Sequence, residues 1–158
     1  MHTATTCAQL ATRIRDVFLQ GTWIANTNYR QALSTITLAQ ALHTSGGHNS
    51  IAALTYHVDY YLSGVLHCLQ GGPLLLSDAQ SFLLPPLTTE ADWQALKSRL
   101  LTHAEAFATT LEAQPDSFLA TPFTNPRYGS WQHNIEGLIE HSYYHLGQVV
   151  LISKLLEP

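Results

Sequence analysis

The sequence is poor in charge, and positive charge is the scarcer kind. Asp, Glu, Lys and Arg make up only 11% of the 158 residues, and seven Lys and Arg against eleven Asp and Glu leave a formal net charge of −4. Proteins that bind nucleic acid neutralise phosphates with clustered basic side chains, whereas the basic residues here are scattered. We therefore expect no nucleic-acid partner.

Cysteines and long apolar runs are also scarce. Cys7 and Cys68 lie far apart with no CxxC motif, which excludes a disulfide framework and suits a reducing compartment. No apolar run reaches the roughly 18 residues that a membrane span needs. The first sixteen residues, MHTATTCAQLATRIRD, place arginines and an aspartate where a signal peptide would be apolar. We expect a cytoplasmic protein with no membrane association.

Apolar residues recur with helical periodicity along most of the chain. The pattern predicts four main helices, at about 6–20, from 49 or 50 to 69, from 88 or 89 to about 111, and at about 130–156, with a short helical piece at 37–42. Ser50 is a good N-cap, and the Gly71-Gly72-Pro73 run ends the second helix. We expect a single all-α domain over 1–158, a four-helix bundle with long connections before its second and fourth main helices.

Histidine is the unusually abundant residue, because nine of them outnumber the lysines and arginines together. On a helical wheel His141, His145 and Gln148 lie in the middle of a wide apolar face of the last helix. His57 points to the apolar side of the second helix, while His67 falls in its solvent sector. Buried imidazoles are costly unless their nitrogens find partners. Three of them on facing helices predict a divalent-metal site formed by His57, His141 and His145.

The remaining histidines have no comparable argument. Surface or loop roles are expected for them, although His48 could lie near the mouth of a pocket. These residues are His2, His43, His48, His103 and His133. Asp59 is expected in the solvent sector of the second helix. Cys68 shares the side of His57 but lies three turns away, about 16 Å along the helix, which is too far to bind the same ion.

Three neutral imidazoles leave at least one coordination position free, which is the catalytic rather than the structural pattern. A water bound there would become acidic enough to attack an ester or amide, and a thiol could bind as thiolate. Gln148 is the candidate for orienting a ligand or the bound water. Tyr60, Tyr61 and Tyr144 are either pocket walls or core aromatics.

The segment NIEGLIEHSYYHLGQ (134–148), paired with IAALTYHV (51–58), resembles the DinB/YfiT-like superfamily of bacterial four-helix-bundle proteins. His57 matches the family's histidine early in the second helix, and His141, His145, Gly147 and Gln148 match its HxxxHxGQ run. The resemblance implies one divalent ion, nickel or zinc, held by three imidazoles. It also implies chemistry of the hydrolase, thiol S-transferase or mycothiol-dependent isomerase kind.

Three functions follow from these observations. The first is a metal-dependent hydrolase-type enzyme acting on a small molecule. The alternatives are a bundle in which the metal only ties two helices together, and a thiol-dependent S-transferase, for which Arg30 and Arg127 are the loop cations available to an anionic thiol. The apolar sector of the last helix spans roughly 240°, wider than two bundle neighbours require, so we expect a homodimer with the first or last helix near the interface.

Overall fold

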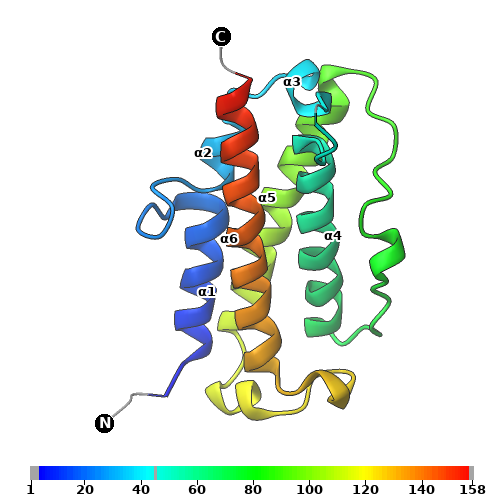
Figure 1. Cartoon of the computed structure of the whole chain (residues 1–158). Helices are drawn as coiled ribbons and strands as arrows, with labels where there is room; N and C mark the ends of the chain where they lie inside the picture. Colours follow the sequence, from blue (N-terminus) through cyan, green and yellow to red (C-terminus); the bar gives the residue numbers. More distant parts are fainter. Residues whose placement is uncertain (1–3, 45, 157–158) are drawn as a thin grey trace.

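Four long helices form the bundle in the computed structural model, which describes residues 4–44 and 46–156 (Figure 1). They are α1 (Cys7–Arg15), α4 (Ile51–Leu69), α5 (Glu90–Glu112) and α6 (Trp131–Leu155). The chain runs up through α1, down through both α4 and α5, and up again through α6. The predicted all-α four-helix bundle is confirmed, including the long connections at 21–50 and 113–130. Within the described residues there is no strand, and one isolated bridge pairs Pro122 with Ser130.

The helices begin where the sequence predicted them to begin, because the expected polar residues cap their first turns. Ser50, Thr89 and Ser130 each accept a hydrogen bond from the backbone N–H three residues later. The first predicted helix differs at its end. Its last five residues form η1 (Asp16–Gln20), which winds with π-helical bonding before Gly21 stops it.

The stretch between Gly21 and α4 contains more helix than the sequence indicated. The predicted short piece is present as α3 (Leu38–Leu42), capped by Thr37. A further helix, α2 (Tyr29–Ser34), was missed because six residues are too short to display a period. Its Tyr29 is buried and donates a hydrogen bond to the carbonyl of Ser142 at 3.0 Å, which attaches α2 to α6.

The connection at 70–89 brings the chain back along the outside of α4, so that α4 and α5 run in the same direction (Figure 1). It packs closely there, since a Cβ added at Gly64 of α4 would come within 2.2 Å of the Leu76 side chain. The Ser77 N–H donates to the Tyr60 hydroxyl at 2.9 Å. A side chain at position 64 would therefore force the Leu76 side chain to move.

One sequence-based expectation about α4 is wrong. Asp59 was assigned to solvent but is only 2% exposed, because α5 covers that side of α4. Its carboxylate pairs with Arg99 and with His103, each at 2.7 Å. His103 thus has a partner inside the bundle, whereas His43, His67 and His133 are exposed as expected. His2 lies outside the described residues.

The α4–α6 contact, where the candidate site lies, is less extensive than the contacts of α5 with α4 and with α1. A looser contact between two helices leaves room for a cleft between their lower halves. None of the helices in the described part of the chain is long and apolar enough to cross a membrane.

Candidate metal centre

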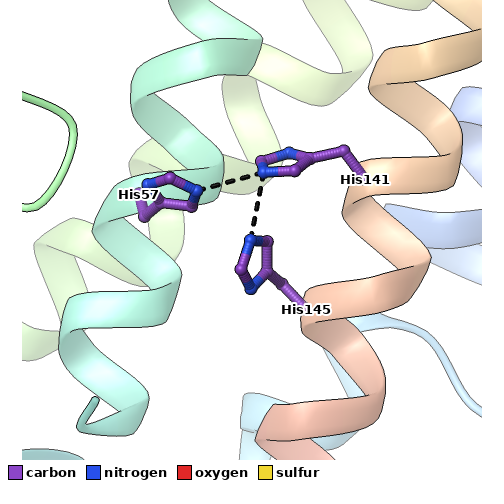
Figure 2. Close-up of side chains that lie close together, drawn as sticks. All are labelled: His57, His141 and His145. Atoms are coloured by element: carbon purple, nitrogen blue, oxygen red, sulfur yellow. Dashed lines mark hydrogen bonds between the residues drawn. The ribbon is translucent and has the colours of Figure 1, made fainter. Parts of the chain in front are cut away.

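The three predicted histidines meet between α4 and α6 (Figure 2). His57 lies in the second turn of α4, and His141 and His145 lie on consecutive turns of α6. The Nε2 atom of His141 is 3.0 Å from Nε2 of His57 and 3.0 Å from Nε2 of His145. One ligand atom from each ring lies within 4.8 Å of the others. The helical-wheel assignment of the three side chains is therefore correct in space.

Hydrogen bonding alone cannot satisfy this arrangement. A neutral imidazole Nε2 carries either one proton or one in-plane lone pair, but Nε2 of His141 faces two other ring nitrogens at once. Nitrogens bound to one tetrahedral ion at normal Zn–N distances would be roughly 3.3 Å apart. Two of the three separations are already near that value. The donor set fits a divalent ion.

The far side of the His145 ring is held by the next turn of α6. Its Nδ1 donates to Oε1 of Gln148 at 2.6 Å. An amide oxygen can only accept, so the ring proton is on Nδ1 and the Nε2 lone pair faces the cluster. The Gln148 amide nitrogen in turn donates to the hydroxyl of Tyr144 at 3.4 Å. Gln148 thus holds one ring of the cluster, and its role in orienting a ligand or the bound water, which the sequence suggested, stays a prediction.

The outer nitrogen of His57 has a different environment. Its Nδ1 is buried and, among the described residues, makes no hydrogen bond of normal geometry. A buried ring nitrogen without a well-formed hydrogen bond is unusual in folded proteins. Here the nearby backbone of Ser81 acts on this ring and raises its pKa.

Burial keeps the cluster neutral. It lowers the pKa of His57 to about 4, helped by the charge on His145 and opposed by the backbone of Ser81 and by Asp78. It also lowers the pKa of His141 to about 4, helped by the charges on His145 and His57. The pKa of His145 is lowered by burial and raised in part by its hydrogen bond to Gln148. Neutral rings are the form that binds a metal.

Two residues of the 70–89 connection complete the surroundings of His57, and sequence reasoning missed both. Phe82 stacks on the His57 ring with centroids 3.9 Å apart and planes 11° from parallel. Asp78 accepts a hydrogen bond from the hydroxyl of Tyr61, whose ring meets those of His57 and His141 edge-on at 5.1 Å and 5.3 Å. The connection has no helical period, so nothing in the sequence indicated which of its side chains return to α4.

A cleft of about 490 Å³ opens beside His141. It lies between the lower halves of α4 and α6, the 74–78 segment and the 123–128 loop, which includes η4 (Pro126–Tyr128). Arg127, the loop cation noted in the sequence, lines it, whereas Arg30 lines a separate open groove along α5. Its lining residues are Tyr61, Val65, Leu74, Leu76, Asp78, Phe123, Arg127, Tyr128, Asn134, Gly137, Leu138 and His141.

Two other candidates do not join the cluster. Cys68 is buried lower on α4 and is not among the side chains that meet the three histidines. The Nδ1 atom of His48 lies 3.0 Å from the carbonyl of Asn49, ahead of α4, and His48 is not one of the grouped ligands. The described cluster is therefore the set of three rings that the sequence indicated.

Comparison with known proteins gives the family. The model of the DinB superfamily matches residues 24–149, which contain α2 to α5, all three histidines, Gln148 and the cleft. Neither a search of curated proteins nor a search of solved structures finds a match. The family match covers most of the chain and extends from the loop after η1 to the last turns of α6, and on this ground the chain belongs to the DinB superfamily.

Proposed function

We propose that this protein is a metal-dependent enzyme of the hydrolase type, acting on a small molecule at the three-histidine site. The observation that carries the proposal is the convergence of three neutral Nε2 atoms on one point beside an open cleft. Catalytic sites of this kind use three protein ligands and leave a position for water or substrate. Nickel or zinc suits the all-nitrogen ligand set.

The residues around the three histidines would have different roles in binding the ion and the substrate. His57, His141 and His145 would hold the ion, and Gln148 keeps a proton on Nδ1 of His145 so that its other nitrogen faces inward. Phe82 and Tyr61 cover His57 and limit the access of water from that side. A bound ion supplies Lewis acidity and a water acidified towards neutrality. The cleft gives a substrate its way to His141.

The two alternatives make different use of the same geometry. An ion that only ties α4 to α6 needs the three histidines but has no use for a cleft at its side. A thiol S-transferase would use both, and Arg127 is a cation in the cleft that could meet an anionic thiol. The presence of the cleft favours an enzyme over a structural tie.

The test is cobalt substitution of the purified protein, because the optical spectrum of cobalt reports changes in its ligands. We expect the spectrum to change with pH and on addition of imidazole or a thiol, and we expect metal-dependent hydrolysis of some members of a panel of small esters and amides. A spectrum indifferent to pH and to added ligands would mean a closed site, and the structural tie would then be the better account.

We also propose that the protein is a homodimer. Leu151 and Leu155 on the outer side of α6 are 60% and 69% exposed, and Trp23 in the loop after η1 is 94% exposed. Trp23 and Ile24 border a depression that Glu140 of α6 also lines, so the exposed apolar side chains of this loop lie beside α6. Light scattering should give twice the chain mass, and Leu151→Glu should give the monomer. A monomer mass for the unaltered protein at micromolar concentration would refute the dimer.

The cytoplasmic location belongs to the same proposal. Cys7 and Cys68 are both buried as free thiols rather than paired in a disulfide, which is the state expected in a reducing compartment.

A further inference from the structure

We propose that the cleft beside His141 binds a small organic anion with an apolar body, whose charged group pairs with Arg127 and whose other end reaches the histidines. The inference names a substrate class for the proposed enzyme and rests on that proposal only for the chemistry at the histidine end. Binding in the cleft itself depends on the cleft walls and on Arg127.

The walls of the cleft fit an apolar body. Val65 comes from α4, Leu74 and Leu76 from the returning connection, Phe123 from the loop after α5, and Leu138 from α6. The volume of about 490 Å³ lies within the range of about 300–1,000 Å³ typical of small-molecule sites. Such a surface favours a compact hydrocarbon or aromatic group over a sugar or a nucleotide.

Arg127 provides the charge at the lower end of the cleft. Its guanidinium lies over the Tyr128 ring, 4.6 Å from the centroid. In the part of the chain that the structure describes, no carboxylate comes within ion-pair distance of it. The loop that carries Arg127 is anchored, because the side-chain amide of Asn134 donates to the carbonyl of Tyr128 at 2.8 Å. An arginine presented in this way suits a carboxylate, sulfonate or phosphate.

The opposite end of the cleft has the opposite charge. Asp78 lines it there and accepts a hydrogen bond from Tyr61, next to His141. An anionic group would be repelled from Asp78 and attracted to Arg127, so the two residues fix the orientation of the ligand. Asn134 beside the Arg127 loop and His141 are seven residues apart on α6, which corresponds to about 10 Å. A ligand that reaches from the Arg127 loop to His141 should therefore have about this length.

Octanoate is a suitable probe, because it has an apolar body of about this length and one terminal negative charge. Its binding to the zinc-loaded protein is followed by NMR titration and compared with that of octanamide, which has the same shape and no charge. We expect shifts at the cleft residues and an affinity for octanoate about tenfold above that for octanamide. Arg127→Gln should abolish this preference. Arg30→Gln, which changes an exposed arginine of a different groove, should leave it unchanged.

A second pair of variants tests the position without changing charge. Gly137 and Gly147 both lie on α6, and a Cβ at either would meet nothing within 4 Å, so both positions accept a larger side chain. Only Gly137 lines the cleft. Gly137→Leu should weaken octanoate binding at least tenfold, and Gly147→Leu should leave it unchanged.

The outcomes separate this inference from the proposed function, because the metal content is measured on the same samples. Equal affinities for octanoate and octanamide, or equal effects of the two leucine variants, would overturn the inference while bound metal left the proposed function standing. Anion binding that depends on Arg127 in a protein that takes up no metal would support the inference and remove the proposed enzyme.

Discussion

Two polar clusters lie on different sides of α4, and their histidines are used in opposite ways. His57 and Asp59 are two residues apart, so they point in nearly opposite directions. Asp59 faces α5, where its two oxygens receive Arg99 and His103. His57 faces α6, where it meets two more imidazoles. Among the described residues, no carboxylate forms an ion pair with this cluster.

The two clusters differ in whether their hydrogen-bond donors and acceptors match one another. In the Asp59 cluster two donors meet one carboxylate, and each of its oxygens has a partner. In the histidine cluster three like groups face one point, and the outer nitrogen of His57 makes no hydrogen bond of normal geometry to any described residue. A buried cluster of the first kind is complete within the chain, while one of the second kind has the geometry to accept a partner from outside it. Variants of the two clusters should therefore affect different properties, metal content in one case and stability in the other.

The largest effect is expected on metal content. Protein purified without chelator should carry about one divalent ion per chain. His57→Ala, His141→Ala and His145→Ala should each lose most of it, because two imidazoles hold an ion far less tightly than three. Metal analysis by mass spectrometry is the measurement. His67→Ala on the exposed side of α4 is the control, and equal loss in the control would contradict the assignment.

The Asp59 cluster should behave in the opposite way. Asp59→Ala removes a buried acceptor from two donors that can partly turn to water, since the Arg99 and His103 side chains are 48% and 29% exposed. We expect the free energy of unfolding to fall by about 1–3 kcal/mol. Metal content should not change. Denaturant unfolding and metal analysis on the same preparation test both halves, and loss of metal would mean that the two clusters are coupled.

A third effect is the pH dependence of the metal-free protein. The pKa values of His57 and His141 are lowered to about 4 by folding, from an ordinary value near 6.5. The unfolded chain therefore binds more protons between these two values, so stability should fall as pH decreases from about 6.5 to about 4. It should level off below that range as far as these groups are concerned.

Chelator-treated protein unfolded in denaturant at a series of pH values gives the slope. His141→Gln should flatten it, because one of the two groups with a strongly lowered pKa is removed, and His67→Gln should leave it unchanged. A slope that survives loss of His141 unchanged would show that other groups control the acid sensitivity.

The helices and the three histidines were predictable from the sequence, because the buried face of a helix appears as a regular spacing of apolar residues. Periodicity and capping residues such as Ser50 and Ser130 located the helices, and the wheel then placed His57, His141 and His145 inward. Burial of Asp59 could not be predicted in this way, since a polar residue facing a neighbouring helix and one facing water look alike on a wheel. Phe82 and Asp78 reach the site from a connection without a period, so only tertiary packing places them there.

The smallest effect concerns Gln148, which contacts the cluster only at the outer nitrogen of His145. Its oxygen accepts the Nδ1 proton of His145, and that bond selects the tautomer whose Nε2 can bind an ion. Gln148→Ala keeps all three imidazoles but lets His145 exchange tautomers and rotate. We expect the fold and the capacity for one ion to be retained, with metal affinity lowered about tenfold. The cobalt-loaded variant should also differ from the unaltered protein in its spectral response to imidazole.

Gln148→Glu supplies the matched comparison, because a carboxylate accepts the same proton and should keep most of the affinity. If the Gln148→Ala and Gln148→Glu variants bind metal equally well, the hydrogen bond to His145 does not contribute to metal affinity. Gln148 would then have to act on a ligand or the bound water, as the sequence alone had indicated.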